Sequence, residues 1–391
     1  MLRTSLDSLP ASRIREVANA ALGSPFANDI VKFWFGEGDL PTPAFIREAA
    51  KAALDAGDTF YNHNLGILEL REAIARYASA LHRTPIASDR IAVTSAGISA
   101  LSLIGQALLD PGDRVAIVTP VWPNLTSIPR ILGAEVVRVP LDCVRGAWSL
   151  DLQRLIDAAR PGTRAVFVNS PGNPTGWVMP QDQWDALHAH CRRHGIWLVS
   201  DDAYERLVYD PKRTVDGHAP GLLGRVDPDE RFISANTFSK TWTMTGWRLG
   251  WLVAPAAFIR DFGKLVEFNT SCAPPFVQRA GITAIAEGEA LIGRTVARLR
   301  GARDLLVRRL GSIPGLELSS PPGAMYLFFR LPGRSDDSLA FAKQLVMEAG
   351  LGLAPGIAFG PEGEGYLRWC FAATDELIER GVERLDGFLR R

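Results

Sequence analysis

The sequence predicts an α/β protein in which a large domain, with a mostly parallel sheet between helices, is followed by a smaller α+β domain. Short β-rich runs alternate with helical stretches between residues 91 and 253, which is typical of parallel strands joined by crossover helices. The runs AVFV and IWLV are apolar at every position, as expected for strands covered on both faces. From about residue 291, a long arginine-rich helical stretch leads into short strands and a final helix, which indicates the second domain.

The chain divides into three predicted segments. We expect residues 1–43 to form an N-terminal arm and part of the small domain, residues 44–290 the large domain, and residues 291–391 the C-terminal small domain. Helical periodicity begins after Thr42-Pro43 and returns over residues 68–81. The predicted strands are 91–94, 114–119, 135–139, 164–169, 196–200, 231–235, 248–253, 324–330 and 366–371, and the helices between the earlier ones are 99–109, 150–159 and 181–194.

Composition narrows the class of protein. Lys+Arg and Asp+Glu each total 43 of the 391 residues, and this neutral balance gives no support for binding nucleic acid or a membrane surface. No apolar run approaches the roughly 18 residues that a membrane span needs, and the N-terminus lacks the apolar region of a signal peptide. The four cysteines are scattered, which favours a reduced, cytoplasmic setting.

Polar motifs follow the predicted strands, where parallel sheets bind their ligands. After AVFV comes NSPGNPTG, residues 169–176, whose prolines and glycines force an irregular loop that presents Asn173. Taken alone, this motif could equally be only a turn. After IWLVS come Asp201 and Asp202, then Tyr204. A carboxylate at the end of a buried strand needs a partner, which a protonated heterocycle nitrogen would supply, although an N-cap for the next helix is the simpler alternative.

A lysine follows another predicted strand, in Thr237-Phe238-Ser239-Lys240, and the segment continues as TWTMTGWRLG to include Arg248. A single lysine is usually a solvated surface charge. Here hydroxyls and aromatic residues flank Lys240 directly after a buried strand, which favours a desolvated amine with a lowered pKa. Schiff-base chemistry requires such an amine.

The turn Ser95-Ala96-Gly97 joins a predicted strand to a predicted helix. Small residues at a helix N-terminus leave free N–H groups that can hold an anion, although a plain connecting turn is more common. The sequence has no GxGxxG after a strand and no GxxxxGK[ST]. Dinucleotide and P-loop sites therefore lack their motifs.

These motifs, in this order, resemble those of the fold-type-I pyridoxal-phosphate enzymes, specifically the class I/II aminotransferases related to aspartate aminotransferase. The resemblance runs from about Gly36 to the C-terminus and depends on NSPGNPTG, SDDAY, SKTWTMTGWRLG and the late arginine of LRWCFAAT. It implies pyridoxal 5'-phosphate as the cofactor, bound by the large domain. It also implies transfer of an amino group from an L-amino acid to a 2-oxo acid by a ping-pong mechanism, and a homodimer with shared active sites.

The resemblance also implies roles at the cofactor ring. Lys240 would form the Schiff base, and Asp201 would pair with the pyridine nitrogen. Tyr204 and Asn173 would share the ring 3-oxygen, while Trp122 would stack on the ring. Lys240, Asp201 and Tyr204 are thus the expected catalytic residues, with no metal involved.

Further roles concern the phosphate and the substrate. The phosphate would be held by Ala96, Gly97, Thr237, Ser239 and Arg248. Tyr61 would reach the phosphate of the neighbouring subunit. Arg368 would clamp the substrate α-carboxylate beside Asn173, with Gly36 lying over it.

Other functions and the choice of donor remain open at this point. A pyridoxal-phosphate lyase on the same fold would share Lys, Asp and Arg, and a non-catalytic aminotransferase-like regulator is the more distant alternative. We expect a neutral or aromatic donor rather than aspartate, with 2-oxoglutarate as acceptor. Arg368 is already assigned to the α-carboxylate and Arg248 to the phosphate, and no other Arg or Lys that could bind a second carboxylate stands out near the motifs. Residues 33–35, 121–122 and 358–359, beside the motifs, are apolar. An arginine from the partner subunit would change this expectation.

Overall fold

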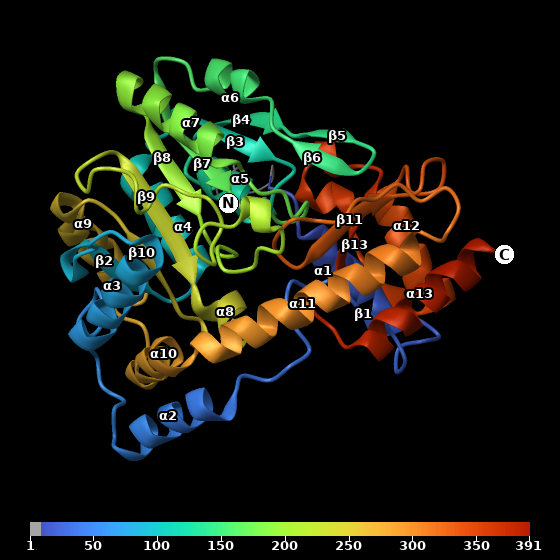
Figure 1. Cartoon of the computed structure of the whole chain (residues 1–391), viewed down its shortest axis with the longest axis horizontal. Coiled ribbons are helices and arrows are strands. Elements are labelled where there is room, and N and C mark those ends of the chain that lie inside the picture. The colour runs from blue at the N-terminus through green and yellow to red at the C-terminus, as the bar shows by residue number, and fades with distance from the viewer. Residues whose placement is uncertain (1–8) are drawn as a thin grey trace, which may run out of the picture.

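The computed structural model describes residues 9–391 and confirms the predicted fold class (Figure 1). Within these residues, seven strands form one sheet in the order β2-β10-β9-β8-β7-β3-β4. The pairs from β9 to β4 are parallel, whereas β10 runs antiparallel to both of its neighbours. The first eight residues of the predicted arm lie outside the described residues.

The strands of this sheet agree closely with the predicted ones. They are β2 (Ile91–Thr94), β3 (Arg114–Thr119), β4 (Glu135–Pro140), β7 (Thr163–Asn169), β8 (Trp197–Asp201), β9 (Phe232–Thr237) and β10 (Gly250–Val253). β10 begins two residues later than the strand predicted at 248–253. The reason is that Arg248 adopts a left-handed conformation, with φ 56°, which cannot be part of a strand.

Helices cover both faces of the sheet, and side chains of one strand alternate between two apolar clusters. On β7, Val166 and Val168 enter one cluster and Phe167 enters the other. This explains the uninterrupted apolar runs of the sequence. The helices of this part are α2 (Ala44–Asp55), α3 (Leu68–His82), α4 (Gly97–Leu108), α5 (Pro123–Ile131), α6 (Leu152–Ala158), α7 (Gln181–His194), α8 (Phe238–Thr241), α9 (Ala256–Glu267) and α10 (Pro275–Glu287).

A third apolar cluster joins the two ends of the chain. The blue N-terminal elements α1 (Arg13–Ala20) and β1 (Val31–Lys32) lie beside the orange and red C-terminal elements in Figure 1, and Val17 packs in the same cluster as Trp369 and Leu385. The long helix α11 (Glu289–Leu310) leads into this part. Its other elements are β11 (Tyr326–Arg330), α12 (Ser338–Gln344), β12 (Leu351–Gly352), β13 (Ala354–Pro355), β14 (Tyr366–Cys370) and α13 (Asp375–Leu389).

The division into an N-terminal arm that shares the small domain, a large domain and a C-terminal small domain, with boundaries at residues 43 and 290, stays a prediction. The hairpin of β5 (Asp142–Val144) and β6 (Ala147–Ser149) lies outside the predicted strands. In the part of the chain that the structure describes, no helix is both long and apolar enough to cross a membrane.

Candidate active site

A cavity of about 690 Å³ opens at the carboxyl ends of β7, β8 and β9 and extends to β14. Most residues predicted for the site line it: Gly36, Gly97, Trp122, Asn173, Asp201, Tyr204, Thr237, Ser239, Lys240, Arg248 and Arg368. Ala96 directly precedes Gly97 in the turn before α4. Tyr61 does not line the cavity of this subunit and is 91% exposed on the surface.

Asp201, the last residue of β8, has a buried carboxylate with few hydrogen-bond donors around it. Within the described residues, its carboxylate accepts a hydrogen bond only from the backbone N–H of Ala203, at 3.3 Å. Burial, together with the neighbouring charge of Asp202, raises the pKa of Asp201 to about 7. A cation placed beside this carboxylate in the cavity would therefore be strongly stabilised, which fits a protonated ring nitrogen.

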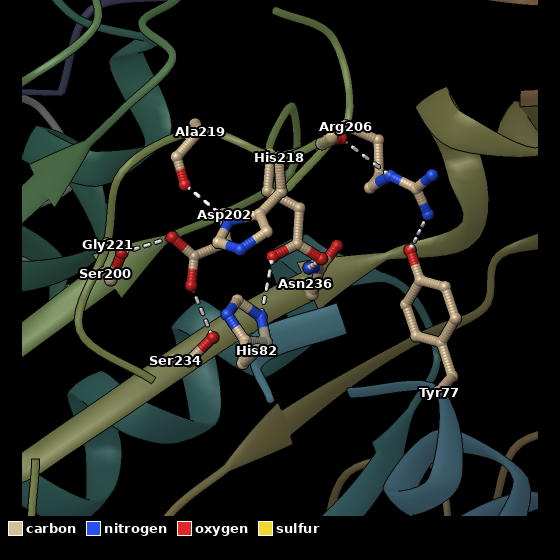
Figure 2. Close-up of polar contacts among 12 residues, drawn as sticks. Tyr77, His82, Ser200, Asp202, Arg206, His218, Ala219, Gly221, Ser234 and Asn236 are labelled. Atoms are coloured by element: carbon tan, nitrogen blue, oxygen red, sulfur yellow. Dashed lines mark hydrogen bonds and ion pairs between the residues drawn. The ribbon is translucent and has the colours of Figure 1, made fainter. Parts of the chain in front are cut away.

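Asp202 points away from the cavity into a buried polar network (Figure 2). Its carboxylate accepts hydrogen bonds from the hydroxyls of Ser200 and Ser234, which tie β8 to β9. Nearby, Glu205 accepts a hydrogen bond of 2.7 Å from Asn236 Nδ2, and His82 Nε2 lies 3.4 Å from its other oxygen. The protein itself thus supplies hydrogen-bond donors to Asp202, whereas Asp201 lines the cavity.

Lys240 lies in α8, the short helix that follows β9. Thr237 caps this helix, because its Oγ1 accepts a hydrogen bond from Ser239 N at 3.1 Å. The Lys240 amine donates to the carbonyl oxygen of Gly36 at 2.5 Å. Burial lowers the pKa of Lys240 to about 8, and the charge of Arg368 adds to this effect. The amine is therefore closer to its neutral, nucleophilic form than a surface lysine.

Tyr326 lines the cavity but is not among the predicted site residues. It lines the cavity from β11, and its hydroxyl lies 2.6 Å from the hydroxyl of Tyr204. A Cβ added to Gly36 would lie 2.2 Å from the Tyr326 oxygen, so only glycine fits there. The available signal was a tyrosine in the apolar run YLFF, which by itself gives no indication of a partner 122 residues away.

Arg368 is a buried guanidinium, 2% exposed, that is held on several sides. It donates to Asn173 Oδ1 at 3.0 Å and to the carbonyl oxygen of Trp34. Its guanidinium carbon lies 4.5 Å from the ring centre of Tyr326 and 4.9 Å from that of Phe359. Among residues 9–391, its Nε finds no hydrogen-bond partner. A buried cation with an unpaired donor fits a carboxylate ligand.

The turn before α4 is a tight cradle for an anion. A Cβ added to Gly97 would lie 3.1 Å from Thr237 Cβ, and one added to Gly250 would lie 2.5 Å from Gly97 N. The hydroxyls of Thr237 and Ser239 lie 2.9 Å apart at the same end of the cavity, which Arg248 also lines. Helix N–H groups, two hydroxyls and a guanidinium form a donor set suited to a phosphate.

The cavity also contains arginines that sequence reasoning missed. Arg13 and Arg15 on α1, Arg130 on α5 and Arg138 on β4 all line it. The expectation that no further Arg or Lys approaches the site is therefore wrong. Their positions in the sequence give no warning of this, because each lies outside the recognised motifs.

A buried lysine amine and an anion cradle thus line the same cavity. Residues 30–385 match the protein family described as aminotransferase class I and II, so the chain belongs to this family and is an aminotransferase of amino acid metabolism. Members of this family use pyridoxal 5'-phosphate. The predicted family is thereby confirmed.

The chain is similar to relatives of differing specificity. It is 33% identical over 377 residues to an aspartate aminotransferase of Pyrococcus horikoshii, covering 96% of this chain and 94% of the relative. It is 31% identical to aromatic-amino-acid aminotransferase 2 of Thermococcus litoralis, covering 100% of this chain and 98% of the relative. A single mutant of the Thermus thermophilus aspartate aminotransferase superposes with a TM-score of 0.89 at 31% identity, covering 99% of both chains.

Proposed function

We propose that this chain binds pyridoxal 5'-phosphate in the cavity and transfers an amino group from a neutral or aromatic L-amino acid to 2-oxoglutarate in a ping-pong reaction. The observation that carries the proposal is the buried Asp201 carboxylate, which faces a cavity that also contains the Lys240 amine. When bound, the cofactor supplies an electron sink for the substrate α-carbon.

The residues that would hold the cofactor surround its expected place. Asp201 would pair with the ring nitrogen, Tyr204 and Asn173 would bind the 3-oxygen, and Trp122 would stack on the ring. Lys240 would bind the cofactor through its amine. The phosphate would occupy the cradle of Ala96, Gly97, Thr237, Ser239 and Arg248, whose donors and steric limits support this assignment.

Two residues would act on the substrate. Arg368 would hold the α-carboxylate with its guanidinium fork, and its unpaired Nε supports this role. Lys240, once its amine is free, would take the proton from the α-carbon, and a pKa near 8 suits a general base at neutral pH. Gly36 leaves the space above the carboxylate open, because a larger residue would collide with Tyr326.

The apolar part of the cavity supports a neutral or aromatic donor. Ile98, Leu101, Ile357 and Phe359 line it. A charged side chain placed against these four residues, away from the cavity arginines, would lose its hydration without gaining a partner. The decisive comparison is the ratio of kcat/KM for leucine or phenylalanine to that for aspartate. A clear preference for aspartate would overturn this part of the proposal.

A homodimer with shared active sites is also part of the proposal. Tyr61, Phe60 and Phe268 are exposed by 91%, 80% and 90%, and Asn62 N lies 3.5 Å from Cys272 Sγ, so the two segments lie side by side. Clustered exposed aromatic residues support an interface with a second copy. Hybrid dimers of Tyr61→Ala and Lys240→Ala subunits should regain activity, whereas no recovery after verified subunit exchange would count against sharing.

The cofactor assignment has a direct test. Borohydride should fix the cofactor to the chain, and peptide mapping should find the label on Lys240. A label on another lysine would overturn the assignment. Assays with and without a 2-oxo acid distinguish a transaminase from a lyase, because a lyase releases ammonia and needs no acceptor.

A further inference from the structure

Arg15 lines the cavity without an acidic partner among the described residues, unlike Arg13 and Arg138. Arg13 pairs with Glu16 at 2.7 Å, and Arg138 pairs with Glu362 at 2.5 Å. Among the described residues, no carboxylate lies within ion-pair distance of Arg15, and its guanidinium lies 5.7 Å from the ring centre of Phe35. An unpaired guanidinium that lines a ligand cavity is available to a ligand anion.

The stacking on Phe35 connects Arg15 to the reacting end of the cavity. The residue before Phe35 is Trp34, whose carbonyl oxygen accepts a hydrogen bond from Arg368. The residue after it is Gly36, whose carbonyl oxygen accepts one from the Lys240 amine. Phe35 is thus fixed between the two groups that would hold the substrate and act on it. The stacking also restricts the long Arg15 side chain, which reduces the entropy lost on binding.

From this arrangement we infer that Arg15 is a specificity residue that receives the distal carboxylate of a dicarboxylic substrate, while Arg368 holds the α-carboxylate. The inference depends on the proposed function and adds the residue that would admit an acidic acceptor such as 2-oxoglutarate. A ping-pong enzyme must accept donor and acceptor in one cavity. Apolar side chains would then contact residues such as Ile98 and Leu101, and acidic ones would turn to Arg15.

Arg130 is the alternative within the same cavity. It is exposed on α5, and no ion pair involving it occurs among the described residues. Within residues 9–391 it makes no contact equivalent to the stacking of Arg15 on Phe35, so its side chain is less restrained. We therefore assign the distal carboxylate to Arg15, and an Arg130→Gln variant serves as the direct rival in the experiment.

The test compares binding and half-reactions in Arg15→Gln, Arg130→Gln and the wild type, all loaded with cofactor. Glutarate and pentanoate have the same carbon count but differ by one carboxylate, and neither can react. Calorimetry should show glutarate binding weakened about 10- to 100-fold in Arg15→Gln, the usual cost of losing a charged hydrogen-bonded pair, with pentanoate binding nearly unchanged. Arg13→Gln, which removes the same charge from the same helix, should change the ratio less than about threefold.

The half-reactions distinguish the two proposals. Reaction with leucine or phenylalanine should proceed in Arg15→Gln at close to the wild-type rate, while 2-oxoglutarate should react about 10- to 100-fold less efficiently. Equal losses for neutral and acidic substrates, no loss, or a loss confined to Arg130→Gln would each overturn the assignment. Failure of the wild type to react with any amino acid would instead overturn the proposed function. Even then, a selective loss of glutarate binding in Arg15→Gln would identify Arg15 as an anion-binding residue.

Discussion

Asp201 and Asp202 are adjacent in sequence, equally buried, and placed in opposite surroundings. Side chains alternate along a strand, so the two carboxylates leave the end of β8 on different sides. Asp202 enters the network of Figure 2, where the Ser200 and Ser234 hydroxyls donate to it. Asp201 faces the cavity and, within residues 9–391, receives a single backbone hydrogen bond.

This contrast shows how a fold separates stability from function at neighbouring positions. A buried carboxylate whose acceptor sites are filled by the protein holds structural elements together. A buried carboxylate with unfilled acceptor sites destabilises the chain unless a ligand supplies the partner. Substitutions on the cavity side should therefore change chemistry, and those on the network side should change folding stability.

The largest effect should come from Lys240→Ala on the cavity side. Because the variant has neither the amine that would bind the cofactor nor the base at the α-carbon, we expect turnover to fall about 10³-fold or more. The phosphate cradle and Asp201 remain, so weak cofactor binding should persist and can be measured by absorbance after dialysis. Turnover within tenfold of the wild type would contradict the assignment.

Asp201→Asn should reduce turnover about 10²- to 10³-fold, because a neutral amide cannot keep the ring nitrogen protonated. The matched variant is Asp202→Asn, which should instead lower the free energy of unfolding by about 1–3 kcal/mol as its hydrogen bonds are disturbed. Single-turnover kinetics and denaturant unfolding separate the two. If Asp202→Asn proved the more damaging to turnover, the roles of the two aspartates would be reversed.

His82→Leu should destabilise the fold, on the order of 3 kcal/mol, because it leaves Glu205 buried with Asn236 as its remaining side-chain partner. Urea unfolding measures this loss. Turnover per folded molecule should change far less than in Asp201→Asn, since His82 does not line the cavity. A variant as stable as the wild type would show that the His82–Glu205 pair contributes little.

The same pair predicts a pH dependence. Burial opposes the charged imidazole, yet the Glu205 carboxylate outweighs it and raises the pKa of His82 above its ordinary 6.5. The stabilisation is thus fully present below about pH 6.5 and is lost as the pH rises through the raised pKa. Stability curves of the wild type should fall in that range, and those of His82→Leu should be flatter there.

The smallest effect should appear in protein stripped of cofactor. Since burial raises the pKa of Asp201 from 3.8 to about 7, the folded state binds the proton more tightly, and stability should decline as the pH rises from about 4 to 7. Asp201→Asn should remove this decline and make the stripped protein slightly more stable at neutral pH. A wild type and variant with parallel pH curves would contradict it.

The amino-acid sequence was sufficient to predict the fold class, the family and the motif residues that line the cavity. The motifs at Asn173, Asp201 and Lys240 each follow a strand, and parallel strands bring their carboxyl ends to one edge of the sheet. The position of each motif directly after a strand therefore predicts that the three motifs lie close together in space. If the alternation of the strand continues one residue past its end, in IWLVSDD, Asp201 and Asp202 point to different sides, although the pattern does not say which one faces the ligand.

Tertiary structure alone decided that choice and added the residues that no motif contains. Asp202 finds its hydrogen-bond partners on β8 and β9, and the nearby Glu205 lies beside His82 of α3. Tyr326 reaches Tyr204 from the other part of the chain. Arg15 enters the cavity because α1 packs among C-terminal elements. Such contacts depend on how whole elements pack, and packing is decided by many apolar side chains together.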